Sequence, residues 1–140
     1  MTYTASANVE NLTLTGSYSI NGIGNNLANT ITGNSGNNQL TGGNGNDTLL
    51  GNNGNDILYG GAGNDEITGG NGNDIFQIGV GNGRDLITDF NSSEDSIELL
   101  GSINTNDLTF SLSNNHTSIN YGNDLLAIVQ NANSADLNFI

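Results

Sequence analysis

Large apolar residues recur every nine positions through the middle of the chain, and the residues between them are mostly glycine, asparagine and aspartate. Each apolar residue lies in a short alternating stretch, so it points to one side of an extended strand. Such a strand is unstable alone, but copies stacked about 4.8 Å apart gain ladder hydrogen bonds and an apolar column. The period therefore predicts an all-β stack whose inward residues are Ile31, Leu40, Leu49, Leu58, Ile67 and Phe76.

The four most regular repeats each begin with a glycine-rich turn that ends in Asn-Asp. Glycine permits the positive φ angles of a tight reversal, and asparagine tolerates them better than most residues. Such a turn directs carbonyl oxygens inward, and the aspartate adds a carboxylate. Calcium accepts about 6–8 oxygen ligands in a flexible geometry, whereas magnesium requires a stricter octahedron. The turns therefore favour calcium; the repeats are Gly42–Leu50, Gly51–Tyr59, Gly60–Thr68 and Gly69–Gln77.

If two repeats make one coil, alternate turns lie on the same edge of the stack. Asp47 and Asp65 then stack on one edge, and Asp56 and Asp74 stack on the other. Carboxylates about 5 Å apart repel by roughly 1 kcal/mol in water and by about 3 kcal/mol at an intermediate dielectric constant. A cation between adjacent coils reverses the sign of this interaction, so metal binding and folding are expected to share one free energy.

Two metal-free structures are the alternatives to this interpretation. Glycine- and asparagine-rich repeats form flexible linkers, and ladders of asparagine can stabilise a solenoid without metal. The linker is disfavoured because position 8 of the repeat is apolar in all four copies. A metal-free solenoid stays open as the alternative.

The charge of the chain is concentrated on the repeats and on the segment that follows them. The net charge is −13, and ten of the 14 acidic residues lie between Asp47 and Glu98, whereas residues 1–41 contain only Glu10. Nucleic acids and anionic membrane surfaces are therefore poor partners. The chain has no cysteine for disulfides, so a metal is the expected staple. No segment has the ~20 apolar residues of a membrane span, and the N-terminus lacks the pattern of a cleaved signal peptide.

The sequence divides into three predicted regions. Residues 1–23 are expected to supply a capping strand that contains Leu12. Residues 24–77 are expected to form the roll, although Asn29 and Asn38 replace aspartate in its first two turns. An amide leaves an oxygen ligand but removes the charge, so metal sites there should be weak or absent. Residues 78–140 are expected to form a C-terminal β cap, with strands at Leu86–Phe90, Ser96–Leu100, Leu108–Leu112, Thr117–Tyr121 and Leu125–Gln130.

The four repeats and the segment Gly79–Leu99 resemble the RTX, or hemolysin-type, calcium-binding family. The resemblance implies a right-handed parallel β-roll with calcium in its turns and a C-terminal antiparallel cap. It also implies a secreted, extracellular protein, exported by a type I system that recognises an uncleaved C-terminal signal. Carried over by position, the carboxylate ligands are Asp47, Asp56, Asp65, Asp74 and Asp85, and the carbonyl donors are Gly43, Gly45, Gly54, Gly61, Gly63, Gly70 and Gly72.

No catalytic motif is present in the sequence. The single histidine, His116, excludes an H-E-x-x-H zinc site and lies in a polar turn, where a solvated residue is expected. No G-x-S-x-G elbow occurs. We therefore expect a monomeric, non-enzymatic module that folds on binding calcium outside the cell. The alternative is an accessory module of a larger secreted enzyme that binds a polysaccharide or a cell surface.

Overall fold

The computed structural model describes all 140 residues, which form fourteen strands and two single-turn 3₁₀ helices. Neither helix has the length or apolar character that a membrane span requires. The first eleven strands are β1 (Thr2–Thr4), β2 (Asn11–Thr13), β3 (Asn21–Ile23), β4 (Thr30–Thr32), β5 (Gln39–Asn44), β6 (Thr48–Asn53), β7 (Ile57–Ala62), β8 (Glu66–Asn71), β9 (Ile75–Ile78), β10 (Asp85–Ile87) and β11 (Ser96–Leu99). The remaining elements are η1 (Thr105–Asp107), β12 (Leu108–Ser113), β13 (His116–Tyr121), β14 (Asp124–Val129) and η2 (Ser134–Asp136).

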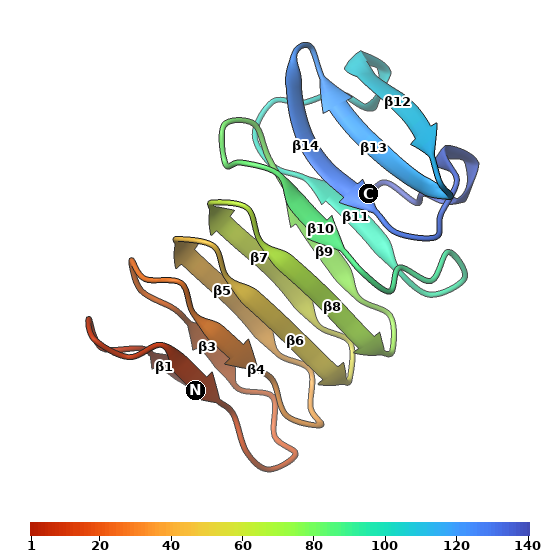
Figure 1. The fold of residues 1–140 in the computed structure, drawn as a ribbon. Helices are drawn as coiled ribbons and strands as arrows, with labels where there is room; N and C mark the ends of the chain where they lie inside the picture. The colour runs from red at the N-terminus through yellow and green to blue at the C-terminus, as the bar shows by residue number, and fades with distance from the viewer.

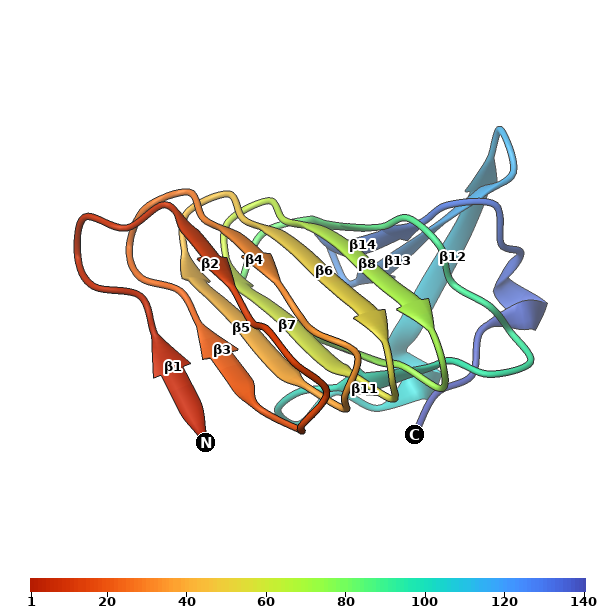
Figure 2. The ribbon, with the colours of Figure 1, turned by 90° about the horizontal axis from the view of Figure 1, so that it is seen from below.

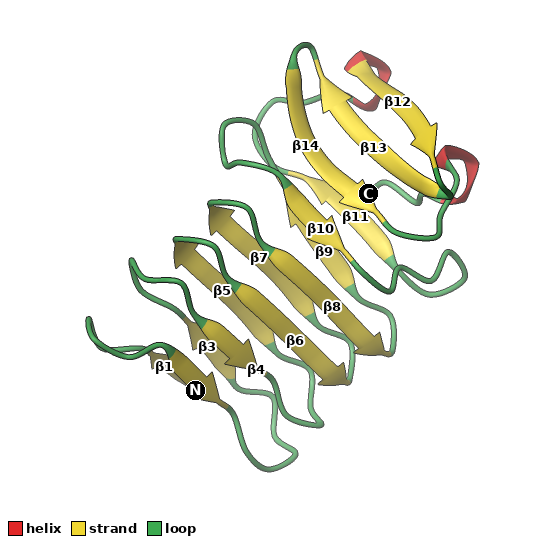
Figure 3. Ribbon diagram, viewed as in Figure 1, coloured by secondary structure: helices red, strands yellow, loops and turns green.

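Successive strands alternate between two sheets, as expected for a parallel β-roll. One sheet has the order β1-β3-β5-β7-β9-β11, and the other contains β2-β4-β6-β8-β10 and is extended by β14, β13 and β12. All pairs from β1 to β11 are parallel. Figures 1 and 2 show the coils stacked from the N-terminal end to the C-terminal cap. Figure 3 shows that the turns between strands form the two long edges of the stack.

The core between the sheets consists of two columns of side chains, one per sheet. All six apolar residues that the nine-residue period predicts to point inward are fully buried. In one sheet Leu40 is aligned with Leu58, which is aligned with Phe76. In the other, Ile31, Leu49 and Ile67 are aligned in the same way. Burying a side chain of this size contributes roughly 1.5–3 kcal/mol, which explains why the coils stabilise one another.

The solenoid continues past Gln77, where the nine-residue period ends. β10 pairs in parallel with β8, and β11 pairs in parallel with β9. Corresponding residues of successive coils are 18 positions apart in the regular coils, but 20 apart between Asp65 and Asp85 and 21 apart between Asp74 and Asp95. The extra residues enlarge the turns and leave the strand stacking intact. The strands predicted near Leu86 and Ser96 therefore exist, but they add rungs to the roll and do not pair with one another.

Antiparallel pairing begins only with β12. β12 pairs with β13, β13 pairs with β14, and β14 joins the solenoid through a parallel pairing with β10. The sequence predicted these three strands and a C-terminal antiparallel cap. On the other sheet, Phe139 forms a bridge with Ile97 at the end of the stack. The C-terminal end of both core columns is therefore covered.

The N-terminal residues form a coil of the same type as the rest. β1 and β2 are the terminal strands of the two sheets, and each pairs in parallel with the corresponding strand of the next coil, so that Thr2 is aligned with Asn21 and Asn11 with Thr30. The strand predicted around Leu12 thus lies at the end of the stack. β1 was not predicted, because its coil is slightly longer than the regular ones and departs from their spacing.

Candidate metal centre

The turn residues predicted to bind metal form two ladders, one along each edge of the roll. The first ladder runs from Asn29 through Asp47 and Asp65 to Asp85. In it the Oδ1 atoms of Asp47, Asp65 and Asp85 each accept the backbone N–H of the ladder residue one coil earlier, at 2.7, 2.8 and 3.3 Å. The structure therefore brings Asp47 and Asp65 together, as predicted from the period, and it places Asp85 next to Asp65.

The second ladder lies on the opposite edge and has the same construction. It runs from Asn38 through Asp56 and Asp74 to Asp95. The Oδ1 atoms of Asp56, Asp74 and Asp95 accept the N–H groups of Asn38, Asp56 and Asp74 at 2.6, 2.9 and 3.0 Å. Each Oδ1 therefore joins one coil to the coil before it.

The second carboxylate oxygen of the four central aspartates has no partner. The Oδ2 atoms of Asp47, Asp56, Asp65 and Asp74 are buried and take part in no hydrogen bond. The residues themselves are at most 2% exposed. An unpaired carboxylate oxygen in such a place is strongly unfavourable, because it loses hydration without compensation. These four atoms are the strongest indication that the turns can bind a cation.

Glycine at the first position of each repeat makes room for these oxygens. A Cβ atom on Gly42 would collide with Asp47 Oδ2 and with the carbonyl oxygen of Gly60. On Gly51 it would collide with Asp56 Oδ2 and the Gly69 carbonyl oxygen. Carboxylate and carbonyl oxygens from successive coils therefore converge where a side chain is absent.

The pKa values of the ladder aspartates are raised, as expected for carboxylates buried in this way. Burial raises the pKa of Asp47, Asp56 and Asp74 to about 6, although hydrogen bonds from backbone N–H groups partly oppose the shift. Burial and the neighbouring Asp65 carboxylate raise the pKa of Asp85 to about 8. Burial also raises the pKa of Asp65. A cation held among these groups would favour their ionised form.

The seven glycines predicted as carbonyl donors all have positive φ angles, between 100° and 145°. The carbonyl oxygens of Gly45, Gly54 and Gly63 point along the stack toward the glycine of the next coil, where a Cβ atom would collide with them. These oxygens accept no hydrogen bond. Gly43 and Gly61 lie within β5 and β7, and the carbonyl oxygen of Gly43 points along the stack toward Gly61 in the same way. Gly70 and Gly72 occupy the corresponding places in the last regular turn.

The candidate sites therefore combine carboxylates from two successive coils with backbone carbonyl oxygens. No cluster of three or more His, Cys, Asp or Glu side chains suited to a metal ion is present. A donor set of anionic and neutral oxygens without nitrogen or sulfur fits a hard cation such as calcium.

The repeats match a known family. The family model of the RTX calcium-binding nonapeptide repeat, which holds four copies, matches residues 23–58 and 50–87. These repeats belong to the RTX family. The chain is also similar to the AlgE6R3 subunit of the Azotobacter vinelandii mannuronan C5-epimerase, with 28% identity and a TM-score of 0.61 over 97% of this chain and 86% of that one. The AlgE6R2 subunit gives 25% identity and a TM-score of 0.64 over 96% and 94% of the two chains. No curated protein matches the sequence.

In the first RTX turn, the polar side-chain atoms of Asn25 and Asn29 all have hydrogen-bond partners within the protein. Asn29 occupies the place of the ligand aspartate, and its Oδ1 accepts the N–H of Asn25 at 2.7 Å. Its Nδ2 donates to the Val9 carbonyl of the preceding coil at 2.8 Å. The Asn25 amide donates to the carbonyls of Ser6 and Val9 at 2.6 and 2.7 Å.

The second turn repeats this arrangement on the other edge. The Oδ1 atom of Asn38 accepts the N–H of Asn34 at 2.8 Å, and its Nδ2 donates to the Ile20 carbonyl at 2.7 Å. The Asn34 amide donates to the Tyr18 carbonyl at 3.0 Å. In both asparagine turns the side-chain amide therefore donates to a carbonyl oxygen of the preceding coil.

The sequence analysis missed Asp95, which ends the second ladder. Asp95 is 3% exposed, and burial raises its pKa. Its Oδ2 accepts the N–H of Asn91 at 2.8 Å, in the manner of the asparagine turns. It follows Asp74 by 21 positions, so counting in steps of two repeats does not find it. The available signal was the Asn-x-x-x-Asp spacing from Asn91, which matches Asn25 to Asn29 and Asn34 to Asn38.

Asn52 and His116 both make contacts that the sequence analysis did not anticipate. Asn52, which replaces the second glycine of its repeat, adopts φ 79° and donates its amide to the Gly33 carbonyl at 2.7 Å, so it adds a bond between coils. His116 was expected to be a solvated turn residue; it remains partly exposed, but it belongs to a strand and not to the turn. It begins β13, is partly buried, and its Nδ1 accepts the N–H of Asn131 at 3.2 Å.

Proposed function

We propose that this chain is a non-catalytic module that folds when it binds calcium outside the cell, and that it forms the C-terminal part of a protein exported by a type I system. The observation that carries the proposal is the set of four buried, unpaired Oδ2 atoms. Membership of the repeats in the RTX family supports calcium as the ion. The proposed cytosolic state is unfolded, because calcium is scarce there and ten acidic residues crowd the segment from Asp47 to Glu98.

Each unpaired Oδ2 corresponds to one proposed ion between two coils. On the first edge the ions lie between Asp47 and Asp65 and between Asp65 and Asp85. On the second edge they lie between Asp56 and Asp74 and between Asp74 and Asp95. The carbonyl donors are the turn glycines of the same coils. Bound calcium would neutralise the carboxylates and join neighbouring coils through these oxygens.

The two asparagine turns are proposed to bind no ion. Their side-chain oxygens already accept an N–H, and their amide groups occupy the carbonyls of the coil before. The proposed stoichiometry is therefore four calcium ions per chain. Two carboxylates per ion place the affinity in the extracellular class, with dissociation constants of about 10⁻⁴–10⁻³ M.

Circular dichroism under calcium titration tests the proposal, and calorimetry counts the ions. We expect a cooperative gain of β signal as calcium rises into the millimolar range, with four ions bound per chain. A spectrum that does not change between chelator and about 10 mM calcium would disprove calcium-dependent folding. If the calcium-free chain is already folded but still binds calcium when it is titrated, the proposed metal sites are kept and only the role of calcium in folding is disproved.

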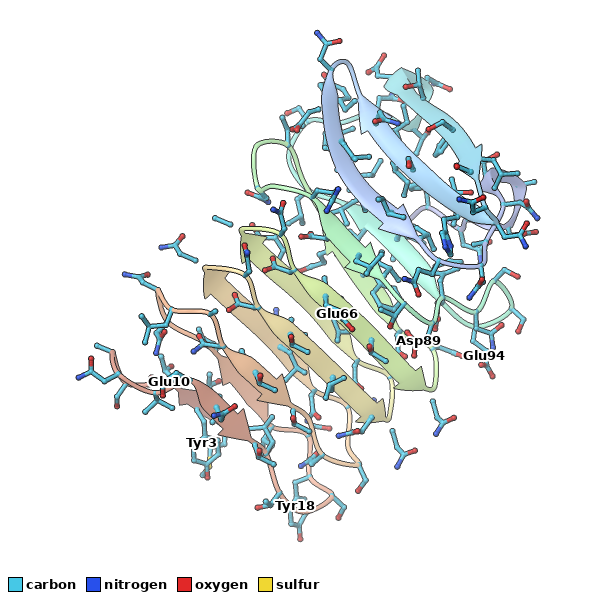
Figure 4. The ribbon with its side chains drawn as sticks, in the orientation of Figure 1. Tyr3, Glu10, Tyr18, Glu66, Asp89 and Glu94 are labelled. Carbon is cyan, nitrogen blue, oxygen red and sulfur yellow. The ribbon has the colours of Figure 1, made fainter.

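A second candidate function is an accessory module that binds a polysaccharide. It is supported by the likeness to two subunits of a mannuronan C5-epimerase and by an open depression of about 330 Å³ beside the first ladder, lined by Arg84, Glu66 and Leu86 among others. Figure 4 shows Glu66 on the outer surface of β8. Binding to a polysaccharide array that is lost in the Arg84→Ala variant would favour this function, and no binding to any array member would exclude it.

A further inference from the structure

The N-terminal end of the roll is open, whereas its C-terminal end is closed. β1 and β2 each pair with one neighbour only, and every other strand from β3 to β10 pairs on both sides. Both free edges belong to one coil and lie at the end of the molecule opposite the cap (Figure 2). Unpaired edges of this kind readily accept another strand, and natural proteins usually cover or charge them.

The core columns also end without a cover at this coil. Tyr3 is aligned with Gly22 and Leu12 with Ile31, so they are the terminal residues of the two columns. Tyr3 is 47% exposed, and Figure 4 shows it at the N-terminal end of the structure. A groove of about 210 Å³ lies there, lined by Tyr3, Leu12, Thr13, Leu14, Thr15 and Ile20.

This end is apolar and almost uncharged. Most of the exposed large apolar side chains of the protein lie between Met1 and Leu27. The only charged side chain in residues 1–41 is Glu10. The side-chain amides of Asn25 and Asn34 donate to backbone carbonyl oxygens in the turns of the terminal coil, so no carboxylate takes part in these contacts. A partner could therefore stack on this coil without the repulsion, or the calcium, that the acidic coils involve.

We propose that the N-terminal end is a docking surface for the last coil of another β-solenoid, whose two strands run parallel to β1 and β2. Such a coil would pair with both free edges and extend both columns at once, which repeats the interface between every two coils of this protein. A single added strand could pair with only one sheet. A second copy stacked head to tail is disfavoured, because its own C-terminal end is covered by Phe139 and by β12 to β14.

Lengthening the roll by one coil in the full chain tests this surface. The segment Thr2–Ile20 is duplicated in tandem, which matches the offset between the aligned residues Thr2 and Asn21. The control carries the same added residues in shuffled order. In saturating calcium, we expect the duplication to slow exchange of the β1 and β2 amides and to raise the melting temperature by about 5 °C. The shuffled extension should do neither.

A pair of single variants makes the result specific to this surface. In the lengthened chain, Tyr3→Asp in the original copy of the segment should remove the gain in melting temperature and amide protection. Leu112→Asp should keep this gain, since Leu112 is 59% exposed on β12. Amide exchange and melting temperature that are equal with the ordered and shuffled extensions would overturn the proposal. So would protection of β1 and β2 in the original chain that rises with its concentration, because the occupant would then be a second copy. Calcium stoichiometry is measured on the same samples, and it is expected to stay unchanged whether or not docking occurs.

Discussion

The asparagine turns and the aspartate turns have the same backbone plan but satisfy it by different means. In the first two turns, an amide supplies both an acceptor for the turn N–H and a donor to the preceding coil. In the next four, a carboxylate supplies acceptors only, and one buried oxygen per turn has no partner. The exchange of one NH₂ group for one oxygen therefore separates a turn whose side chain is fully hydrogen-bonded from a turn that keeps a buried, unpaired carboxylate oxygen.

Calcium removal should produce the largest difference between the aspartate turns and the asparagine turns. Excess chelator is expected to abolish amide protection in residues 42–99, because unpaired buried carboxylates are then left to repel one another. Any protection that persists should lie in the asparagine-rich coils before residue 42. Hydrogen exchange followed by mass spectrometry measures both regions in one experiment. Equal protection of both regions without calcium would show that the aspartate turns need no cation.

Replacing Asp65, which two proposed ions share, should have the next largest effect. Asp65→Ala is expected to weaken two proposed ions and Asp47→Ala only one, so the losses of stability in calcium should be about 3 and 1.5 kcal/mol on the scale of charge-assisted contacts. Urea denaturation in saturating calcium measures the difference. Equal losses for the two variants would contradict the sharing of Asp65 between coils.

Acidity should partly replace calcium in the aspartate turns. The pKa of Asp47, Asp56 and Asp74 is raised by burial from an ordinary value of 3.8 to about 6. Because the folded pKa is the higher one, protonation of these groups stabilises the metal-free fold fully below pH 3.8, and the contribution is lost as the pH rises through 6. Metal-free chain should therefore show more β signal at pH 4 than at pH 7.5.

The calcium-bound protein should respond to pH in the opposite direction. Its ligands must be ionised, so calcium affinity should fall as the pH drops through the same range. Calcium titrations at pH 7.5 and 5 measure this. A metal-free spectrum that is independent of pH, together with an unchanged calcium midpoint, would mean that these carboxylates are not buried in the folded chain.

The smallest expected effect comes from converting one kind of turn into the other. Asn38→Asp removes the amide donor to Ile20 and adds an unpaired carboxylate one coil before Asp56. We expect a loss of about 1 kcal/mol in the metal-free state and one additional bound calcium. Asn37→Asp is the matched control, because Asn37 lies beside Asn38 but is exposed. Calorimetry that counts the same ions in both variants would show that a carboxylate in this turn does not create a site.

Much of the central roll could be predicted because its coils have equal length. The apolar residue at position 8 identified the core of six repeats, and aspartate at position 6 identified most of both ladders. The prediction failed where a turn contains extra residues. Asp95, the parallel pairing of β10 with β8 and the parallel pairing of β11 with β9 were missed because the coils there are longer than the regular ones. Turns on the surface accept insertions at little cost in free energy, so they disturb the period without disturbing the stacking.

The sequence by itself determined the local chemistry: which residues are buried in strands, where the chain turns and which turns carry a carboxylate. These properties depend on residue type and spacing within one repeat. Only the tertiary structure decided which oxygen of each carboxylate is left unpaired, which residues end each ladder and which end of the roll is covered. Those properties depend on contacts between successive coils of unequal length and on the contact between Phe139 and Ile97. A pattern within one repeat does not specify such contacts, because the length of each turn sets which residues meet.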